Sequence, residues 1–260
     1  MSKFYGYDIS DILLFTLFLI IIFILYCYTS LIWVNFRKIS QQYKNKHFYS
    51  LLETLKTENI TINNIPSELK DYIRIFNVKL PNNVNKSEYI LHLFFKKFPE
   101  FKKYKNNYKI IDELNFTGGY FPTIHTDIEW NKIKNNGIQF WYLEYNKNSN
   151  NNGNIFLFYN DFLYNKYKNQ SIELELDEKK NEIVILKNCI IGYEIDRITV
   201  ENFKKHTKKY YLNITPGQCI MFKKNVLHMS DNRIENNNRK SLNFRVVFKN
   251  KKGNIDKIND

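Results

Sequence analysis

The stretch 137–143 reads Gly-Ile-Gln-Phe-Trp-Tyr-Leu. It is the central member of a series of short runs rich in Ile, Val, Phe and Tyr. Clusters of Asn, Gly, Asp and Lys separate these runs, and no interval between them contains a helix long enough for a crossover connection. This spacing is typical of antiparallel strands, so the C-terminal part of the chain is predicted to be a β-sandwich or barrel. The other runs are residues 155–159, 172–176, 183–186, 210–214, 219–222 and 242–248.

The composition excludes several classes of protein. Of the 260 residues, 43% are hydrophobic and 17% aromatic, which is too apolar for a disordered chain. Only 8 Gly and 5 Pro are present, and the sequence contains no Gly-rich phosphate-binding loop. The three cysteines, Cys27, Cys189 and Cys219, form no C-x-x-C pair, so neither a disulfide framework nor a zinc knuckle is predicted. The net charge of +13 comes from lysines spread along the whole chain and identifies no partner by itself.

Residues 12–34, ILLFTLFLIIIFILYCYTSLIWV, contain no charged side chain. At about 1.5 Å per helical residue, this run is long enough to cross a hydrocarbon core about 30 Å thick. A secretory signal peptide has a shorter apolar core and a small-residue cleavage site, and neither is present. We therefore predict a single N-terminal transmembrane helix, preceded by a short tail at residues 1–11.

The charges beside this predicted span set its expected orientation. Lys3 precedes the span together with two aspartates, whereas four basic residues follow it: Arg37, Lys38, Lys44 and Lys46. Because cytoplasmic flanks carry the excess of Lys and Arg, the C-terminal part is predicted to face the cytoplasm. The sequons at Asn59 and Asn115 would suit a lumenal domain instead, but such sequons arise often by chance in an Asn-rich chain.

Residues 35–105 are predicted to be mainly helical. An amphipathic pattern covers residues 35–56, with Phe48 and Leu52 among its apolar positions. Ser67 and Ser87 each precede a helix-like pattern and are predicted N-caps. Further along, the Asn-rich stretch 146–154 is predicted to be a hairpin loop.

The first segment that contains candidate metal-ligating residues is Pro122-Thr-Ile-His125-Thr126-Asp127-Ile-Glu129-Trp130. In a strand, residues i and i+2 point to the same face, so His125 and Asp127 present an imidazole and a carboxylate side by side. This pair can supply two of the three ligands of a divalent metal. Glu129 shares the same face and is the rival carboxylate. The pattern alone is weak, because H-x-D also occurs by chance on half-exposed strands.

Two later segments add a histidine and an arginine. His228 follows the apolar residues Val226 and Leu227, where a lone histidine is more often a core residue than a ligand. The strand 239–248 has two different faces, and its polar face carries Arg239, Ser241, Asn243 and Arg245.

Together these segments are more specific than each one alone. His125, Asp127 and a distant His228 form the 2-His-1-carboxylate set that holds Fe(II) on one face and leaves open positions for a chelating cosubstrate and dioxygen. Arg239 lies eleven residues after His228 and can clamp a carboxylate with its planar guanidinium. Ser241 points to the same face.

With these motifs, residues 110–250 resemble the phytanoyl-CoA dioxygenase-like branch of the Fe(II)- and 2-oxoglutarate-dependent oxygenases. The resemblance consists of His125-x-Asp127, the strand 137–143, a loop closing at 152–156, Pro216-Gly217 with Phe222, His228-x-Ser230, and Arg239 at the expected offset. It implies a double-stranded β-helix of the jelly-roll or cupin type with flanking helices. It further implies that the two histidines and the aspartate bind iron.

The resemblance also implies how the cosubstrate is held. Arg239 would bind the distal carboxylate of 2-oxoglutarate, and Trp141 and Ser230 would approach the cosubstrate. Arg239-Lys-Ser241 is similar to the R-x-S pair of other members of the superfamily. A Lys- and Glu-rich insert at residues 177–182 departs from the family pattern, and substrate residues are not carried over.

The sequence therefore predicts a single-pass membrane protein with a cytoplasmic Fe(II)- and 2-oxoglutarate-dependent dioxygenase domain acting on a small molecule, lipid or acyl chain. Its expected parts are the tail 1–11, the span 12–34, a helical juxtamembrane region 35–105, the β-helix domain 106–250 and a tail 251–260. Two alternatives stay open: a prolyl-hydroxylase-like enzyme acting on peptide in a secretory lumen, and a non-catalytic β-helix binding module. A nucleic-acid substrate would suit the basic charge, but it fits a membrane anchor poorly.

Overall fold

The computed structural model divides into two compact units, residues 1–47 and 48–260, and each is described by itself. It describes residues 3–4, 7–8, 17–21, 47–118, 123–127, 137–148, 152–167, 170–189, 192–231 and 238–249. In the first unit, β1 (Lys3–Phe4) pairs antiparallel with β2 (Tyr7–Asp8). Residues 17–21 are helical and exposed. The predicted span 12–34 otherwise lies outside the described residues, and among those described no helix is long and apolar enough to cross a membrane.

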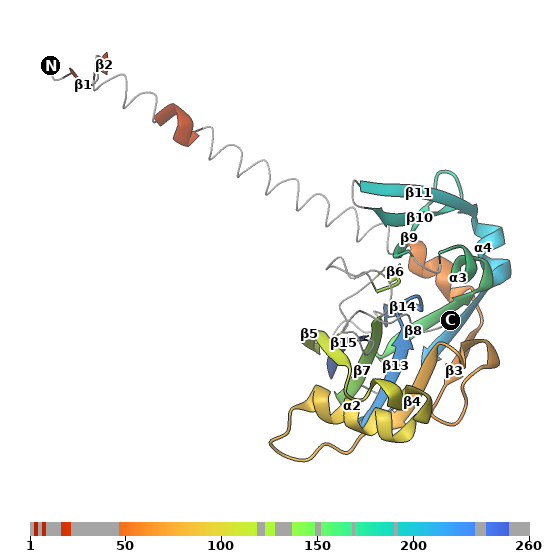
Figure 1. Ribbon diagram of the computed structural model, residues 1–260. Coiled ribbons are helices and arrows are strands. Elements are labelled where there is room, and N and C mark those ends of the chain that lie inside the picture. The colour runs from red at the N-terminus through yellow and green to blue at the C-terminus, as the bar shows by residue number, and fades with distance from the viewer. Residues whose placement is uncertain are drawn as a thin grey trace. The chain divides into compact units, whose positions relative to one another are not determined.

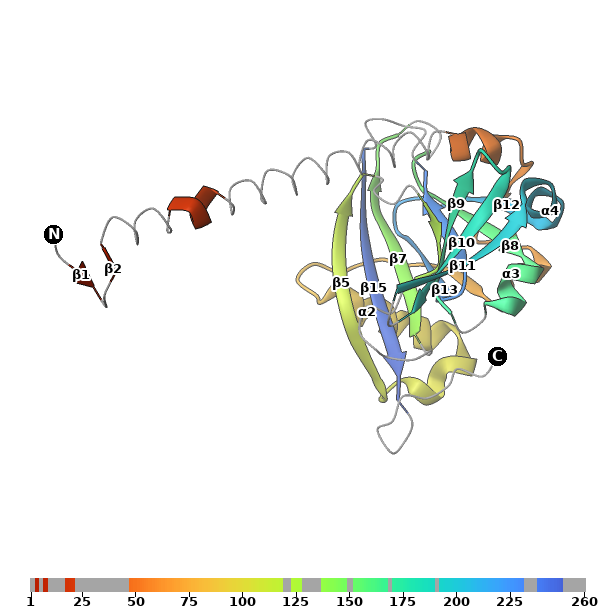
Figure 2. The same cartoon turned by 90° about the horizontal axis from the view of Figure 1, so that it is seen from above.

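The second unit is a jelly-roll-like β-sandwich of two sheets (Figure 1). The smaller sheet has the strand order β4-β13-β7-β15-β5. Its strands are β4 (Ile73–Asn77), β13 (Gln218–Lys223), β7 (Gly137–Asn146), β15 (Arg239–Phe248) and β5 (Tyr108–Thr117). Figure 2 shows β5, β15 and β7 side by side as long strands, in agreement with their antiparallel pairing.

The larger sheet has the order β11-β10-β9-β6-β14-β8-β12-β3. Its pairs are antiparallel except for β12 and β3, which run parallel. Two of its central strands are short: β6 (Ile124–His125) and β14 (Leu227–Ser230). The others are β11 (Gly192–Thr199), β10 (Glu182–Cys189), β9 (Ile172–Asp177), β8 (Ile155–Asn160), β12 (Thr207–Leu212) and β3 (Thr57–Ile60).

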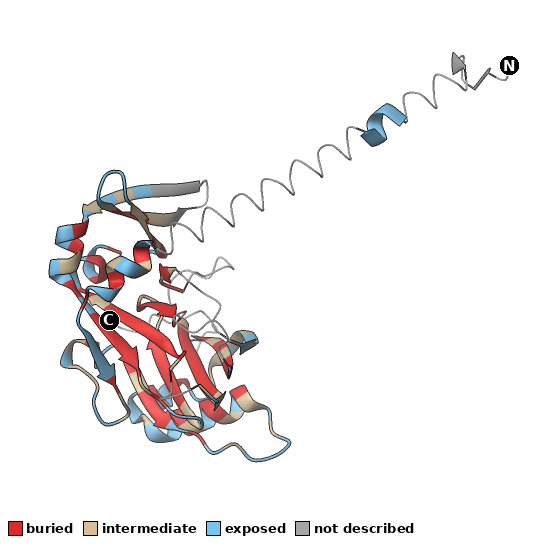
Figure 3. Ribbon diagram, turned by 180° about the vertical axis from the view of Figure 1, so that it is seen from behind, coloured by how far each residue is buried: buried red, intermediate tan, exposed pale blue. Residues whose placement is uncertain are grey.

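Three apolar clusters hold the layers together. The cluster between the sheets joins Trp141 and Ile220 of the smaller sheet to Leu157 and Leu212 of the larger one. A second cluster covers the outer face of the smaller sheet with α2 (Lys86–Lys97) and η2 (Pro99–Tyr104). A third covers the outer face of the larger sheet with α3 (Asp161–Lys166), α4 (Val200–His206) and the helical residues 48–53. Figure 3 shows the resulting band of buried residues along the central strands.

The predicted mainly β fold is confirmed, and each of the seven predicted apolar runs overlaps a strand. The stretch 146–154 is not a hairpin loop, because the strands on its two sides, β7 and β8, belong to different sheets. The chain therefore changes from the smaller sheet to the larger sheet between β7 and β8. The Lys- and Glu-rich insert 177–182 is the turn between the paired strands β9 and β10.

The stretch predicted to be helical, residues 35–105, also contains two strands. β4 packs Ile73 and Ile75 between the sheets, and β3 pairs with β12. Both segments are short, and their pairing partners lie far away in sequence, so tertiary contacts override the local pattern. Helix α2 is present, with Ile90 and Phe94 on its buried face.

The two predicted N-caps are wrong. Ser67 makes no capping bond, because η1 (Ser67–Leu69) follows Pro66 and the Ser67 hydroxyl donates to Glu68. Asn85 caps α2 by accepting from the Glu88 N–H group. The Ser87 hydroxyl is buried and donates to Glu113 at 2.6 Å, so it serves the contact between the helix and β5 instead.

Candidate metal centre

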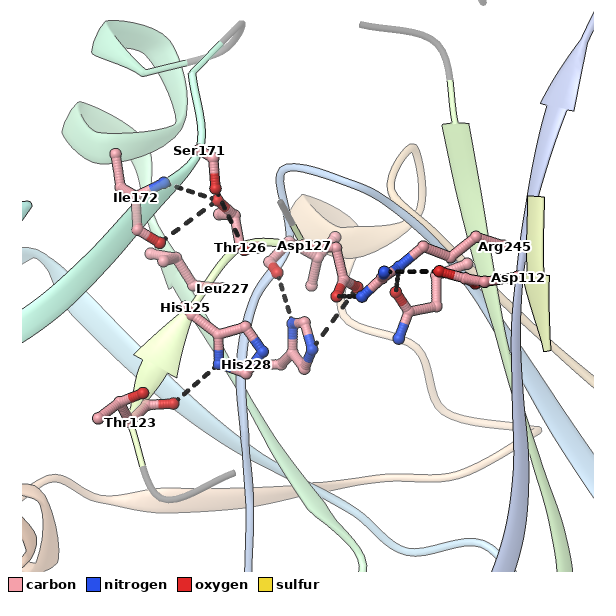
Figure 4. A network of polar contacts seen from close by, with 12 residues as sticks. Asp112, Thr123, His125, Thr126, Asp127, Ser171, Ile172, Leu227, His228 and Arg245 are labelled. Atoms are coloured by element: carbon pink, nitrogen blue, oxygen red, sulfur yellow. Dashed lines mark hydrogen bonds and ion pairs between the residues drawn. The ribbon is translucent and has the colours of Figure 1, made fainter. Parts of the chain in front are cut away.

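The short strands β6 and β14, with the segment that follows β6, bring together three side chains of the types that ligate metals. His125 at the end of β6 is the register partner of His228 on β14, and Asp127 lies two residues after His125. One ligand atom from each of the three lies within 4.8 Å of the other two. The His228 Nε2 to Asp127 Oδ2 distance is 3.7 Å (Figure 4). The three residues that the sequence predicted as metal ligands therefore converge on one point.

Backbone carbonyls fix the orientation of both imidazole rings. The Nδ1 atom of His125 lies 2.9 Å from the Thr123 carbonyl oxygen, and that of His228 lies 2.9 Å from the Val226 carbonyl oxygen. A neutral imidazole that donates through Nδ1 carries its lone pair on Nε2. Metal-binding histidines in proteins are commonly oriented by such a bond on the other ring nitrogen. Both rings are thus set to ligate through Nε2.

The Asp127 carboxylate has one satisfied and one unsatisfied oxygen. Oδ1 accepts a hydrogen bond from Arg245 Nη2 at 2.7 Å, whereas the buried Oδ2 has no hydrogen-bond partner among the residues that the structure describes. An unpartnered charged oxygen costs free energy when it is buried, so a native structure that keeps one requires an explanation. A divalent cation between Oδ2 and the two histidines supplies that explanation, and the donor set fits Fe(II).

Burial and neighbouring charges keep Asp127 and His228 in the protonation states that bind a metal. Burial, helped by the nearby His125, lowers the pKa of His228 to about 4, so this ring is neutral at neutral pH. Burial raises the pKa of the Asp127 carboxyl, but His228, Arg245 and His125 together outweigh it and hold the pKa below its usual value. An ionised carboxylate and a neutral imidazole are the forms that a metal ion binds.

Arg245 is the functional residue that sequence reasoning missed. Its guanidinium donates to Asp127, to Asp112 Oδ2 at 2.8 Å and to Gln139 Oε1 at 3.2 Å. These partners come from both neighbouring strands of β15 and from the segment after β6 (Figure 4). The sequence shows only that Arg245 shares a strand face with Arg239, and nothing in the local pattern indicates that a metal-ligating carboxylate lies opposite it.

Arg239 is buried at the other end of the same strand. Its Nη1 donates to the carbonyls of Gly153 and Asn154 at 2.6 and 2.9 Å, and its Nη2 donates to the carbonyl of Gly118 at 2.6 Å. The guanidinium carbon lies 5.1 Å from the centre of the Trp141 ring. Burial lowers the pKa of Arg239 to about 10, which still leaves it charged at neutral pH. The Nε atom is buried and has no hydrogen-bond partner in the part of the chain that the structure describes.

The other predicted cosubstrate residues lie on the inner faces of the two sheets. Ser241 and Asn243 follow Arg239 on β15, and each has a buried side-chain oxygen with no hydrogen-bond partner within the described ranges. Ser230 is buried two residues after His228 on β14. Lys240 points to the opposite face and forms an ion pair with Glu144 at 3.0 Å. Whether Arg239, Ser241, Ser230 and Trp141 bind a cosubstrate stays a prediction, and Glu129 lies outside the described residues.

Comparisons with known proteins give a limited result. No protein-family model and no curated protein matches the chain. Among solved structures, the chain is similar to a taurine dioxygenase from Burkholderia xenovorans, with a TM-score of 0.36, 11% identity, and coverage of 78% of this chain and 92% of that one. It is also similar to a protein from the same organism described as an alpha-ketoglutarate-dependent taurine dioxygenase, with a TM-score of 0.36, 10% identity, and coverage of 78% and 94%. Neither is a phytanoyl-CoA dioxygenase, so that narrower resemblance stays a prediction.

Removing a metal ligand is expected to abolish tight metal binding. We predict that His228→Ala weakens Fe(II) binding by more than about 100-fold, beyond the effect typical of residues that only orient a ligand. Anaerobic equilibrium dialysis of the full chain measures this affinity. The matched control is His206→Ala, which changes an exposed histidine at the end of α4 and is expected to leave the affinity unchanged. Equal affinities for the parent and His228→Ala would disprove the site.

The Arg245 contact with Asp127 is expected to stabilise the folded protein. We predict that Arg245→Met lowers the free energy of unfolding by about 3 kcal/mol, because it leaves a buried carboxylate without its counter-charge. In an Asp127→Asn background, the same substitution should cost at least about 1 kcal/mol less. Urea unfolding of the parent, the two single variants and the double variant at neutral pH gives the double-mutant cycle. Arg197→Met is the control, since its ion pairs with Asp177 and Glu182 lie at the surface and should contribute about 1 kcal/mol or less. An Arg245→Met cost that is the same in both backgrounds contradicts the coupling.

Proposed function

We propose that this chain is an Fe(II)- and 2-oxoglutarate-dependent oxygenase with a double-stranded β-helix fold, and that it hydroxylates an organic substrate. The observation that carries the proposal is the buried, unpartnered Asp127 Oδ2, which faces two imidazoles oriented to ligate through Nε2. Two histidines and one carboxylate with open positions are typical of non-haem Fe(II) oxygenases. The similarity to the Burkholderia proteins is compatible with this function but too low to argue for it.

A row of unsatisfied polar atoms supports 2-oxoglutarate as the cosubstrate. Within the described residues, Arg239 Nε and Ser241 Oγ are buried without hydrogen-bond partners on the inner face of β15. The hydrogen bonds of the Arg239 guanidinium in the same residues all go to neutral carbonyls, so an anionic carboxylate would be a stronger acceptor than these. A dicarboxylate that chelates the metal at one end could use these donors at the other end.

The residues of this chain would each contribute a defined part to the reaction. When bound, the iron with 2-oxoglutarate and dioxygen supplies the oxidising chemistry, and succinate and carbon dioxide are the products beside the hydroxylated substrate. His125, Asp127 and His228 would hold one face of the metal. Arg245 binds Asp127 Oδ1 and so orients the carboxylate, and the apolar cluster between the two sheets excludes water from one side of the site.

The structure also bears on the alternatives. A prolyl-hydroxylase-like enzyme would use a lysine for the cosubstrate, but Lys240 lies on the face away from Ser241 and pairs with Glu144. A non-catalytic binding module has no need for a buried carboxylate oxygen aimed at two histidines. Both observations favour an oxygenase that uses Arg239.

Succinate formation tests the proposed reaction, and Ser241→Ala tests the cosubstrate site. The full chain in detergent with Fe(II), reductant and 2-oxoglutarate should release succinate even without its substrate. Ser241→Ala should raise the 2-oxoglutarate concentration for half-maximal turnover about 10- to 100-fold, the loss expected for a hydrogen bond to a charged group. Because the Ser241 hydroxyl has no partner among the described residues, its removal should not lower the free energy of unfolding.

Lys240→Ala is the control for this experiment, since it changes the neighbouring residue on the opposite face of the strand. It should leave the 2-oxoglutarate requirement unchanged. Absence of succinate from the iron-loaded parent would favour the binding-module alternative. Succinate formation with an unchanged requirement in Ser241→Ala would remove Ser241 from the cosubstrate site.

We further propose that residues 12–34 anchor the chain in a membrane with the oxygenase domain in the cytoplasm, where it would act on a lipid or acyl chain. The uncharged run and the basic residues that follow it support this arrangement. Tethering would raise the local concentration of membrane substrates.

Glycosylation mapping in eukaryotic cells tests the orientation. Asn59 and Asn115 are both exposed, so each would be accessible to modification in a lumen. We expect neither to be modified in the full chain. A version in which a signal peptide replaces residues 1–34 should become glycosylated at these sites, which shows that they are competent acceptors. Modification of the unaltered chain would place the domain in the lumen and shift weight to the peptide-hydroxylase alternative.

A further inference from the structure

The strands that carry the two histidines are too short to hold them by ladder hydrogen bonds alone. β6 has 2 residues and β14 has 4. Metal sites require ligand atoms to be held closely in place, and the residues that orient the ligands contribute substantially to affinity. Contacts from other elements must therefore fix these two strands.

Thr126, between the two ligands of the H-x-D segment, forms one such contact. Its N–H group donates to the Ile172 carbonyl at 2.9 Å, and its Oγ1 accepts from the Ile172 N–H group at 2.9 Å. Thr126 is 3% exposed and opposes Ile172, one position beyond the pair formed by His125 and Glu173. The side chain thus extends the β6–β9 pairing by one residue (Figure 4).

After Thr126, the pairing with β9 does not continue at Asp127. The Asp127 N–H group donates to the Lys224 carbonyl at 3.2 Å, in the turn between β13 and β14. Thr126 is therefore the last residue bonded to β9 before the carboxylate ligand. Its bonds to Ile172 therefore hold the backbone immediately before Asp127.

Tyr164 of α3 forms the corresponding contact on the other histidine strand. Its hydroxyl donates to the Phe158 carbonyl at 3.0 Å and accepts from the Leu227 N–H group at 3.3 Å. Leu227 and Phe158 are register partners, and His228 follows Leu227 directly. The hydroxyl therefore bridges β8 and β14 at the end of β14 where the ligand lies. Tyr164 is 4% exposed, so water does not compete for these bonds.

Both contacts come from one stretch of the chain. Tyr164 lies on α3, and Ile172 is the first residue of β9, the next described strand along the chain. We propose that Tyr164 of α3 and Ile172 at the start of β9 position the metal ligands, with Thr126 and Tyr164 as positioning residues that act through the backbone beside His125, Asp127 and His228. This inference rests on the proposed metal site but assigns these two residues a role beyond it.

Thr126→Val tests the first contact because valine keeps the shape of threonine and removes its hydroxyl. We expect anaerobic Co(II) titration of the full chain to show a 10- to 100-fold weaker affinity in Thr126→Val, the range typical of residues that orient metal ligands. The visible absorption spectrum of the bound Co(II) should also change, because the ligand geometry changes. Thr126→Ser, which keeps the hydroxyl, should restore both the affinity and the spectrum.

Thr207→Val is the matched control. Thr207 is a buried threonine of the same sheet whose Oγ1 accepts from Asn160 Nδ2 at 2.9 Å, far along the sheet order from β6. The Thr207→Val substitution should lower the free energy of unfolding without changing the Co(II) affinity or the spectrum of the bound Co(II). This result would separate a positioning role from a general loss of stability.

Tyr164→Phe tests the second contact and keeps the ring in its apolar cluster. It should also weaken Co(II) binding and alter the spectrum, and it keeps the proposal testable if Thr126→Val fails to fold. A parent that binds Co(II), together with a Thr126→Val or Tyr164→Phe variant of equal affinity and spectrum, overturns the positioning role and leaves the proposed function standing. A parent that binds no Co(II) overturns both.

Discussion

The contact between Asp127 and Arg245 is the interaction on which the site depends. Asp127 follows β6 of the larger sheet, and Arg245 lies on β15 of the smaller sheet, so the contact joins the two layers of the sandwich. A buried carboxylate without a counter-charge costs several kcal/mol, and Arg245 offsets this cost at only one of the two oxygens. The other oxygen is left facing the histidines, which is the arrangement that a metal ion requires.

The layered fold explains why these groups meet. The apolar cluster between the sheets contains Trp141, Leu157 and Ile220, and the polar face of β15 lines the same interlayer space. β14 contributes His228 and Ser230 from the larger sheet, while its alternate residues Leu227 and Met229 pack in the outer cluster. Strand alternation thus places His228 and Ser230 on the interlayer face of β14 and its two apolar residues on the outer face.

Sequence periodicity predicted the parts of this arrangement that depend on local geometry. The sequence predicted that His125 and Asp127 would lie together on one strand face. They do lie together, but β6 ends at His125, so Asp127 is held by the contacts that follow the strand. The separation of Arg239 from Lys240 follows from strand alternation. The joining of His228 to this pair followed from family resemblance, because the two histidines lie about one hundred residues apart and no local pattern records their pairing. The role of Arg245 was missed for the same reason, since its partner lies 118 residues away. The short strands β3 and β4 also depend on tertiary contacts that a single sequence does not show. The Asn85 cap of α2 is a local contact with the Glu88 N–H group, so the sequence did contain this signal.

The most direct test of the metal centre is a crystal of the protein soaked in Mn(II), with anomalous diffraction data collected at a wavelength where manganese scatters anomalously. We predict one strong peak between the two sheets, about 2.0 to 2.2 Å from His125 Nε2, His228 Nε2 and Asp127 Oδ2. Arg245 should remain bonded to Asp127 Oδ1. A map with no peak at this position, or with a peak that leaves Asp127 Oδ2 unbound, would contradict the assignment of these three residues as a metal centre.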